Sequence, residues 1–160
     1  MRRIGITGGI GSGKSVVSRL LRIMGYSVYD TDSEAKRLME SSLEVVQKLS
    51  ECFGRDIYHN GRLNRGLLSS RVFGESDKIV LLNSIVHPVV RFDFYRWSES
   101  LNEEICFVES AILYESRFDE LVDEVWTVTA PEELRIGRVR QRSGLTEEEI
   151  KKRMAAQLSE

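Results

Sequence analysis

The chain has 160 residues, a formal net charge of −2, and apolar and charged fractions of 41% and 30%. This length suffices for one domain with a sizeable core, and the composition is typical of a soluble globular protein. The small net charge gives no electrostatic support for a nucleic-acid partner, and no apolar run approaches the ~20 residues that cross a bilayer, so we expect neither nucleic acid nor a membrane as a partner.

The first predicted elements surround a glycine-rich segment, residues 8–15 (Gly-Gly-Ile-Gly-Ser-Gly-Lys-Ser). Arg3–Thr7 before it reads as a short strand, and Val16–Met24 after it reads as a helix. The apolar residues of this helix share one side: Val16, Val17, Leu20, Leu21 and Met24. A strand, a G-x-x-x-x-G-K-S segment and a helix in this order predict a phosphate-binding loop.

Each part of this loop has a physical use in binding a nucleoside triphosphate. The glycines let backbone N–H groups turn inward, and the helix N-terminus adds its positive dipole. Lys14 brings a mobile positive charge, and the Ser15 hydroxyl can bind Mg²⁺. We predict nucleotide contacts at Gly9, Ile10, Gly11, Ser12, Gly13, Lys14, Ser15 and Val16. The alternatives are a chance glycine turn and a degenerate loop that no longer binds nucleotide.

The middle of the chain is predicted to be mainly helical. Ser27–Asp30 reads as a second strand, and helical spacing follows at Ser33–Glu40 and Leu43–Phe53. Residues 64–101 are mostly helical, and the pair His87-Pro88 predicts an interruption and the start of a new helix. This long helical stretch looks like an insertion on the substrate side of the fold.

Two apolar runs in the second half, Ile105–Glu109 and Glu124–Val128, predict strands buried on both faces of a parallel sheet. Pro131–Gln141 predicts an arginine-rich helix, and Thr146 with Glu149 predicts a capping box at the start of the last helix. Strands that alternate with helices imply right-handed crossovers, so the predicted fold class is α/β, a parallel sheet flanked by helices.

The cysteines and the N-terminus favour the cytoplasm. Cys52 and Cys106 are far apart in the sequence and lie among apolar residues, which favours two buried thiols over a disulfide or a metal pair. The apolar stretch between Met1 and the first glycines is too short for a signal peptide.

Three acidic residues follow predicted strands at the edge where open parallel sheets bind ligands: Asp30, Asp32 and Glu109. Phosphoryl transfer needs one carboxylate for the attacking hydroxyl and another for the metal or its water shell. We assign the first role to Asp32 and the second to Glu109. The alternative for Asp30 and Asp32 is that they only cap or support the next helix.

Arginines are concentrated near residue 138. Arg135, Arg138 and Arg142 recur at i, i+3 and i+7, so they lie near one helical face. Near a phosphate loop, such a face suits a lid that neutralises charge on the transferred group. A solvated basic face explains the pattern equally well, and the residues alone leave both interpretations open.

Taken together, these segments resemble a known family, the dephospho-CoA kinases. The phosphate loop alone is shared by many unrelated proteins, whereas the combination in this order is much more specific. The matching segments are residues 4–15, Asp30-Thr31-Asp32, His87-Pro88-Val89-Val90-Arg91, residues 109–115, and the positions of Arg138, Arg142 and Gln157. They extend over essentially the whole chain.

The resemblance implies a three-layer P-loop kinase fold and an enzyme that transfers the ATP γ-phosphoryl group to the ribose 3′-hydroxyl of dephospho-CoA, with Mg²⁺. It implies these catalytic residues: Lys14, Asp32, Arg138 and Arg142. Ser15 and Glu109 would bind the metal. The acceptor site would contain Thr7, Asp32, His87, Arg91, Leu113 and Glu115. For His87 and Arg91, a helix-start residue and a plain surface arginine are the competing interpretations.

The resemblance also divides one P-loop kinase domain, residues 1–160, into regions. Residues 1–32 and 103–136 would form the nucleotide-binding core, 33–102 the helical acceptor-binding region, and 137–150 the lid. The partner would be the small molecule dephospho-CoA, and the protein a monomer or a weak homo-oligomer.

The sequence departs from the family in four places, one of which is Tyr114 where the family has phenylalanine. Ser110-Ala111 replaces a proline region, and Arg135 stands where the family often has glutamine. The sequence also stops at Glu160, whereas the family continues with a segment that supplies a final strand and adenine contacts. Two alternatives stay open: another small-molecule or nucleoside monophosphate kinase, and a nucleotide-dependent switch, although the guanine-reading N-K-x-D element is not found.

Overall fold

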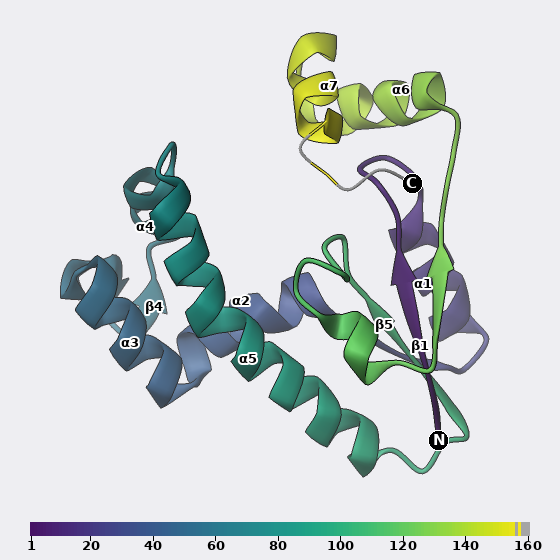
Figure 1. Cartoon of the computed structure of the whole chain (residues 1–160), viewed down its shortest axis with the longest axis horizontal. Coiled ribbons are helices and arrows are strands. Elements are labelled where there is room, and N and C mark those ends of the chain that lie inside the picture. Colours follow the sequence, from purple (N-terminus) through teal and green to yellow (C-terminus); the bar gives the residue numbers. More distant parts are fainter. Residues whose placement is uncertain (156, 158–160) are drawn as a thin grey trace. The chain divides into compact units, whose positions relative to one another are not determined.

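The computed structural model describes residues 1–155 and 157, and the chain divides into two compact units (Figure 1). Met1–Asp30 and Leu101–Glu160 form the first unit, and Thr31–Ser100 form the second. Within the described residues, no helix combines the length and the apolar character that crossing a membrane requires.

The first unit is built on a parallel four-stranded sheet in the order β2-β5-β1-β6. Its strands are β1 (Arg2–Thr7), β2 (Ser27–Asp30), β5 (Ile105–Glu109) and β6 (Glu124–Thr127). The two central strands, β1 and β5, are mostly buried, in agreement with their continuous apolar runs.

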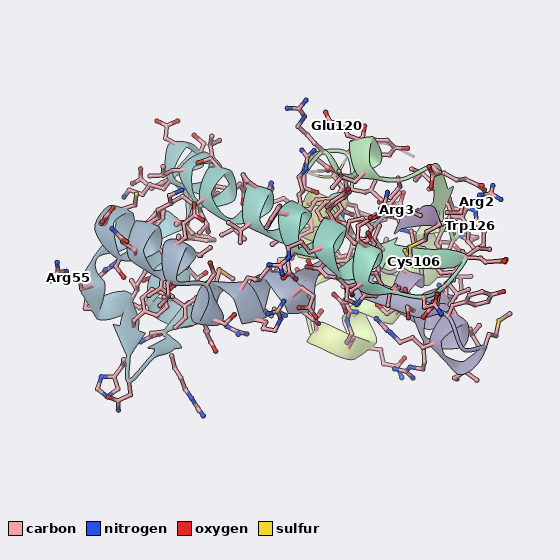
Figure 2. The ribbon with its side chains drawn as sticks, turned by 90° about the horizontal axis from the view of Figure 1, so that it is seen from below. Arg2, Arg3, Arg55, Cys106, Glu120 and Trp126 are labelled. Atoms are coloured by element: carbon pink, nitrogen blue, oxygen red, sulfur yellow. The ribbon has the colours of Figure 1, made fainter. Side chains whose placement is uncertain are left out.

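Strand β6 differs from its prediction, because it is only partly buried. Among the described residues it is an edge strand that pairs with β1 alone, so one side of it lacks a covering neighbour. Trp126 is 39% exposed there. On this edge the Glu124 carboxylate accepts hydrogen bonds from the Arg2 guanidinium and from Trp126 Nε1, and Figure 2 shows Arg2 and Trp126 close together.

Helix α1 (Lys14–Ile23) follows the glycine-rich loop, as predicted. Leu21 is buried in a cluster with three sheet residues, Ile4, Ile6 and Phe107, and Val17 packs against it. The other apolar residues on that side, Val16, Leu20 and Met24, are exposed. The helix therefore buries a narrower stripe than its sequence suggests.

The parallel register brings two of the predicted carboxylates together. Asp30, the last residue of β2, is aligned with Glu109, the last residue of β5, and Glu109 is also aligned with Ile6 of β1. One residue earlier in β1, a Cβ atom on Gly5 would lie 2.6 Å from Cδ1 of the fully buried Leu113. The segment after β5 therefore packs directly on the backbone of the strand that leads to the loop.

Helices α6 (Glu132–Ser143) and α7 (Glu147–Ala155) pack on each other (Figure 1). A short 3₁₀ helix, Phe118–Leu121, precedes β6. The α6–α7 cluster consists of Ile136, Val139 and Ile150, with Ile10, Leu145 and Met154 packed against it. One of these residues, Ile10, belongs to the glycine-rich loop, so the loop and the two helices share a small apolar core.

The capping box predicted at the start of α7 is confirmed. The backbone N–H and the hydroxyl of Thr146 donate to Oε2 of Glu149 at 2.8 and 2.9 Å, and the Glu149 N–H donates to Oγ1 of Thr146 at 3.3 Å. The hydrogen bond from the Thr146 backbone, followed by that from its hydroxyl, holds the pKa of Glu149 below its ordinary value.

The second unit is mainly helical and includes a short antiparallel hairpin. Its elements are α2 (Thr31–Ser41), α3 (Leu43–Phe53), a 3₁₀ helix (Arg55–Ile57), β3 (Tyr58–His59), β4 (Arg62–Leu63), α4 (Arg65–Val72) and α5 (Ser76–Ser100). Helix α5 continues through Pro88, so the interruption predicted at His87-Pro88 is wrong. The break lies at residues 73–75 instead, where Gly74 has a φ of +79°.

Burial explains why α5 tolerates the proline. A proline inside a helix removes one backbone hydrogen bond, whereas α5 has a buried stripe that spans the position: Ile85, Val86, Val90 and Phe94.

The two cysteines differ in burial, because Cys106 is buried as predicted but Cys52 is exposed. Cys52 lies off the buried stripe of α3, which consists of Val45, Leu49 and Phe53.

Candidate active site

The glycine-rich loop connects the carboxyl end of β1 to the N-terminus of α1, as predicted. Gly13 is the N-cap of α1 with a φ of +110°, and Gly11 has a φ of +79°, conformations that strain any residue with a Cβ atom. The first turn of a helix presents N–H groups without intrahelical partners. A glycine loop that ends at such a turn is a binding site for phosphate.

Lys14 and Ser12 both fit a polar ligand at this loop. Lys14 Nζ donates to the carbonyl of Gly8 and, at 3.2 Å, to that of Gly9, which fixes a positive charge at the loop. The hydroxyl of Ser12 is buried and has no hydrogen-bond partner among the described residues. Buried hydroxyls are rarely left unsatisfied, so the residues present suit a bound phosphate.

Ser15 and Glu109, the two residues predicted to bind the metal, lie in contact. The Ser15 hydroxyl donates to Oε1 of Glu109 at 3.2 Å, and Glu109 is only 9% exposed. Asp30 ends the neighbouring strand at the same level. Within residues 1–155 and 157, no group of three or more acidic, His or Cys residues could bind a metal. A hydroxyl and a carboxylate nevertheless suit Mg²⁺, which takes few protein ligands and completes its shell with phosphate and water.

Of the two predicted lid arginines, one lies at the loop. Arg138 Nη1 donates to the carbonyls of Gly11 and Ser12 at 3.2 and 3.1 Å. Arg142 is exposed in the last turn of α6, and no hydrogen bond joins it to the loop in the described part of the chain. The structure therefore brings Arg138 to the phosphate loop, and a role for Arg142 there stays a prediction.

Two further residues contact the loop, although neither is among the predicted site residues. Arg135 Nε donates to the carbonyl of Ile10 at 3.0 Å, and the N–H of Ile10 donates to Oε1 of Gln157 at 2.8 Å. The signal for Arg135 was its place on the same helical face as Arg138. Nothing local indicated that Gln157 would reach a residue 147 positions away.

The predicted acceptor residues are divided between the two units. In the first unit, Thr7 is 8% exposed and Glu115 is exposed, whereas Leu113 is fully buried against Gly5. Leu113 therefore serves the core, and its predicted contact with the acceptor receives no support from its burial. In the second unit, Asp32 is exposed in the first turn of α2.

His87 and Arg91 lie one turn apart on α5, and both are partly buried. Burial lowers the pKa of His87 from its ordinary value, and the positive charge of Arg91 lowers it further. His87 is therefore held mainly as the neutral imidazole at neutral pH. A neutral imidazole beside a guanidinium can accept or donate a hydrogen bond, which leaves an acceptor-binding role chemically open.

The parallel sheet, the phosphate loop and the Ser15–Glu109 pair place this protein among the P-loop nucleotide-binding proteins. A family model described as dephospho-CoA kinase matches residues 2–160. The chain belongs to the dephospho-CoA kinase family, a family of ATP-dependent kinases.

The chain also resembles individual relatives and solved structures along almost its whole length. The chain is 46% identical over 157 residues to a dephospho-CoA kinase of Porphyromonas gingivalis, a match that covers 98% of this chain and 78% of that relative. The crystal structure of TT1252 from Thermus thermophilus matches with a TM-score of 0.84 at 38% identity. This match covers 98% of the present chain and 80% of the TT1252 chain. A dephospho-CoA kinase from Campylobacter jejuni, at 24% identity and a TM-score of 0.69 over 98% and 81% of the two chains, shows the same fold.

Proposed function

We propose that the chain transfers the γ-phosphoryl group of ATP to the ribose 3′-hydroxyl of dephospho-CoA, which gives CoA and ADP. The observation that supports this most is the family match over residues 2–160, in a chain whose phosphate loop has every required residue. The geometry adds support, because Lys14, Arg138 and the N-terminus of α1 converge on that loop.

In the proposal, residues of the first unit act on the phosphates and on the metal. Lys14 and Arg138 neutralise negative charge on the phosphates, and Arg142 joins them from the lid. Ser15 and Glu109 hold Mg²⁺, which when bound screens the charge of the phosphate oxygens. The role of Arg138 rests on the family's pattern and on its contacts with the loop carbonyls, whereas the role of Arg142 rests on the family's pattern alone.

Asp32 is the proposed base. Its carboxylate takes the proton of the 3′-hydroxyl as that oxygen forms a bond to the γ-phosphorus, and the bond from this phosphorus to the bridging oxygen breaks with its electron pair leaving on ADP. Its place at the start of α2, directly after the strand that ends in Asp30, supports this assignment. Thr7, His87, Arg91, Leu113 and Glu115 are the residues proposed for the acceptor site.

The test is an acceptor panel. With Mg-ATP, we expect the chain to convert dephospho-CoA to CoA with stoichiometric ADP, and to act poorly on AMP, CMP and shikimate. Turnover on one of the other acceptors without turnover on dephospho-CoA would refute the substrate and favour another kinase of this fold. Tight GTP binding without any acceptor phosphorylation would favour a nucleotide-dependent switch.

A second experiment tests the base. Asp32→Asn should lower kcat about 100-fold or more while ATP affinity changes little, because a general base contributes mainly in the transition state. Glu34→Gln is the matched control, since it removes the other carboxylate from the first turn of the same helix. An unchanged kcat for Asp32→Asn would show that the assignment is wrong. A cytoplasmic location and a monomeric or weakly oligomeric state stay predictions.

A further inference from the structure

One residue of the phosphate loop, Ile10, is held at three points by the C-terminal part of the chain. Its side chain packs against the apolar cluster of α6 and α7. Its carbonyl accepts a hydrogen bond from Arg135 Nε at 3.0 Å, and its N–H donates to Gln157 Oε1 at 2.8 Å. The N–H and the carbonyl of Ile10 are therefore both hydrogen-bonded to side chains more than 120 positions away in the sequence.

Arg135 also borders the loop on either side of Ile10. A Cβ atom on Gly9 would collide with the Arg135 guanidinium, and a Cβ atom on Gly11 would lie 2.6 Å from the Arg135 carbonyl oxygen. Arg135 itself is only partly exposed. At Gly11, where φ is also +79°, the approach of the α6 backbone leaves room for glycine only, whereas a side chain at Gly9 would displace the Arg135 guanidinium.

We propose that Arg135 is a positioning residue that, together with Gln157, holds the Ile10 backbone and keeps the phosphate loop in its nucleotide-binding shape. A glycine-rich segment has many accessible conformations, and ordering it costs free energy each time a ligand binds. Contacts that order the loop beforehand raise the fraction of molecules ready to bind. The inference deepens the proposed function and rests on it for the kinetic readout, whereas nucleotide binding tests it separately.

The proposal predicts an effect on binding rather than on chemistry. In Arg135→Leu, the Kd for Mg-ADP by calorimetry and the KM for ATP should each rise about tenfold, because fewer molecules hold the loop in the competent shape, while kcat at saturating ATP stays within about twofold. Arg135→Lys keeps a donor for the Ile10 carbonyl and should recover most of the affinity. Arg140→Leu is the matched control, since it removes the same charge from an exposed position of the same helix, and should change neither constant.

Gln157→Ala gives an independent variant that acts on the same peptide from the other side. It should also weaken Mg-ADP binding, and the double variant with Arg135→Leu should be less affected than the product of the two single effects, because both losses release one loop. If Arg135→Leu does not fold, as judged by its thermal unfolding, Arg135→Lys and Gln157→Ala provide the same comparison.

Two results would overturn the proposal. An unchanged Kd for Mg-ADP in folded Arg135→Leu would show that the contact is merely structural. A large loss of kcat at unchanged KM would mean that Arg135 acts on the transferred phosphoryl group and is a catalytic residue. A wild-type chain that binds Mg-ADP but does not phosphorylate dephospho-CoA would refute the proposed function alone, since the binding comparison could still be made.

Discussion

A single methyl group at Gly5 offers a sharp test of how the strand before the phosphate loop is packed. In Gly5→Ala the new Cβ atom would lie 2.6 Å from Leu113 Cδ1, 3.4 Å from Val122 Cγ2 and 3.7 Å from the Glu124 carbonyl oxygen. Favourable carbon–carbon contacts are about 3.5–4.0 Å, so only the contact with Leu113 overlaps strongly, by about 1 Å. Leu113 is fully buried and cannot move outward into solvent.

Two opposing contributions set the size of the effect. Overpacking a core by one methyl group costs about 1–3 kcal/mol, whereas replacing glycine by alanine restricts the unfolded chain and returns about 0.4–1 kcal/mol. We therefore expect Gly5→Ala to lower the free energy of unfolding of the first unit by about 1–2 kcal/mol. Leu113→Ala alone should cost about 2–5 kcal/mol through the cavity that it leaves.

Urea unfolding followed by tryptophan fluorescence measures these changes. Trp126 lies in the first unit and Trp97 in the second, so a Trp97→Phe background reports on the first unit alone. In the double variant Gly5→Ala/Leu113→Ala the methyl occupies part of the cavity, and the loss should be smaller than the sum of the single losses by about 0.5 kcal/mol or more. Strict additivity, or a Gly5→Ala variant as stable as the parent, would refute the close contact.

Three other predictions concern the loop, the last helix and pH. Lys14→Met should lower kcat at least about 1000-fold and leave the thermal midpoint nearly unchanged, because the lysine acts on phosphate charge. A kcat lowered by less than about tenfold would contradict this. Thr146→Ala should lower the free energy of unfolding by about 1 kcal/mol through loss of the cap, and a thermal midpoint unaffected by the substitution would refute this. Because the pKa of Glu149 is lowered in the folded chain, the stability that its cap supplies should be lost as the pH falls below about 4.5. His87 has a lowered pKa in the folded chain, so the unfolded chain binds its proton more readily and stability should fall as the pH drops below about 6.5. His87→Gln should therefore reduce the difference between the thermal midpoints at about pH 7.5 and about pH 5.5. An equal difference in the parent and the variant would contradict the reasoning.

Some errors of the sequence analysis share one physical origin. The break expected at His87-Pro88 came from local propensity, but burial of one side of α5 outweighs a single missing hydrogen bond. Cys52 and part of the apolar side of α1 were judged by residue type, whereas exposure depends on which side of each helix finds a partner. Leu113 is a different case, because it is buried against Gly5 while its contact with the acceptor, which the family resemblance implies, stays a prediction.

What the sequence determined by itself was local or encoded in the order of short segments. The phosphate loop with its flanking strand and helix, the Thr146–Glu149 cap, the strands of the parallel sheet and the family all follow from patterns a few residues long, because backbone conformation at glycine, caps and alternating burial are set by near neighbours. The aligned ends of β2 and β5 follow from the parallel topology.

Only the tertiary structure decided which distant side chains attend the loop. Arg138 reaches the loop, and Ile10 is held by Arg135 and Gln157, contacts that depend on how α6 and α7 pack on the glycine segment. No local pattern encodes such contacts, since their geometry is the outcome of packing between segments that are far apart in the chain.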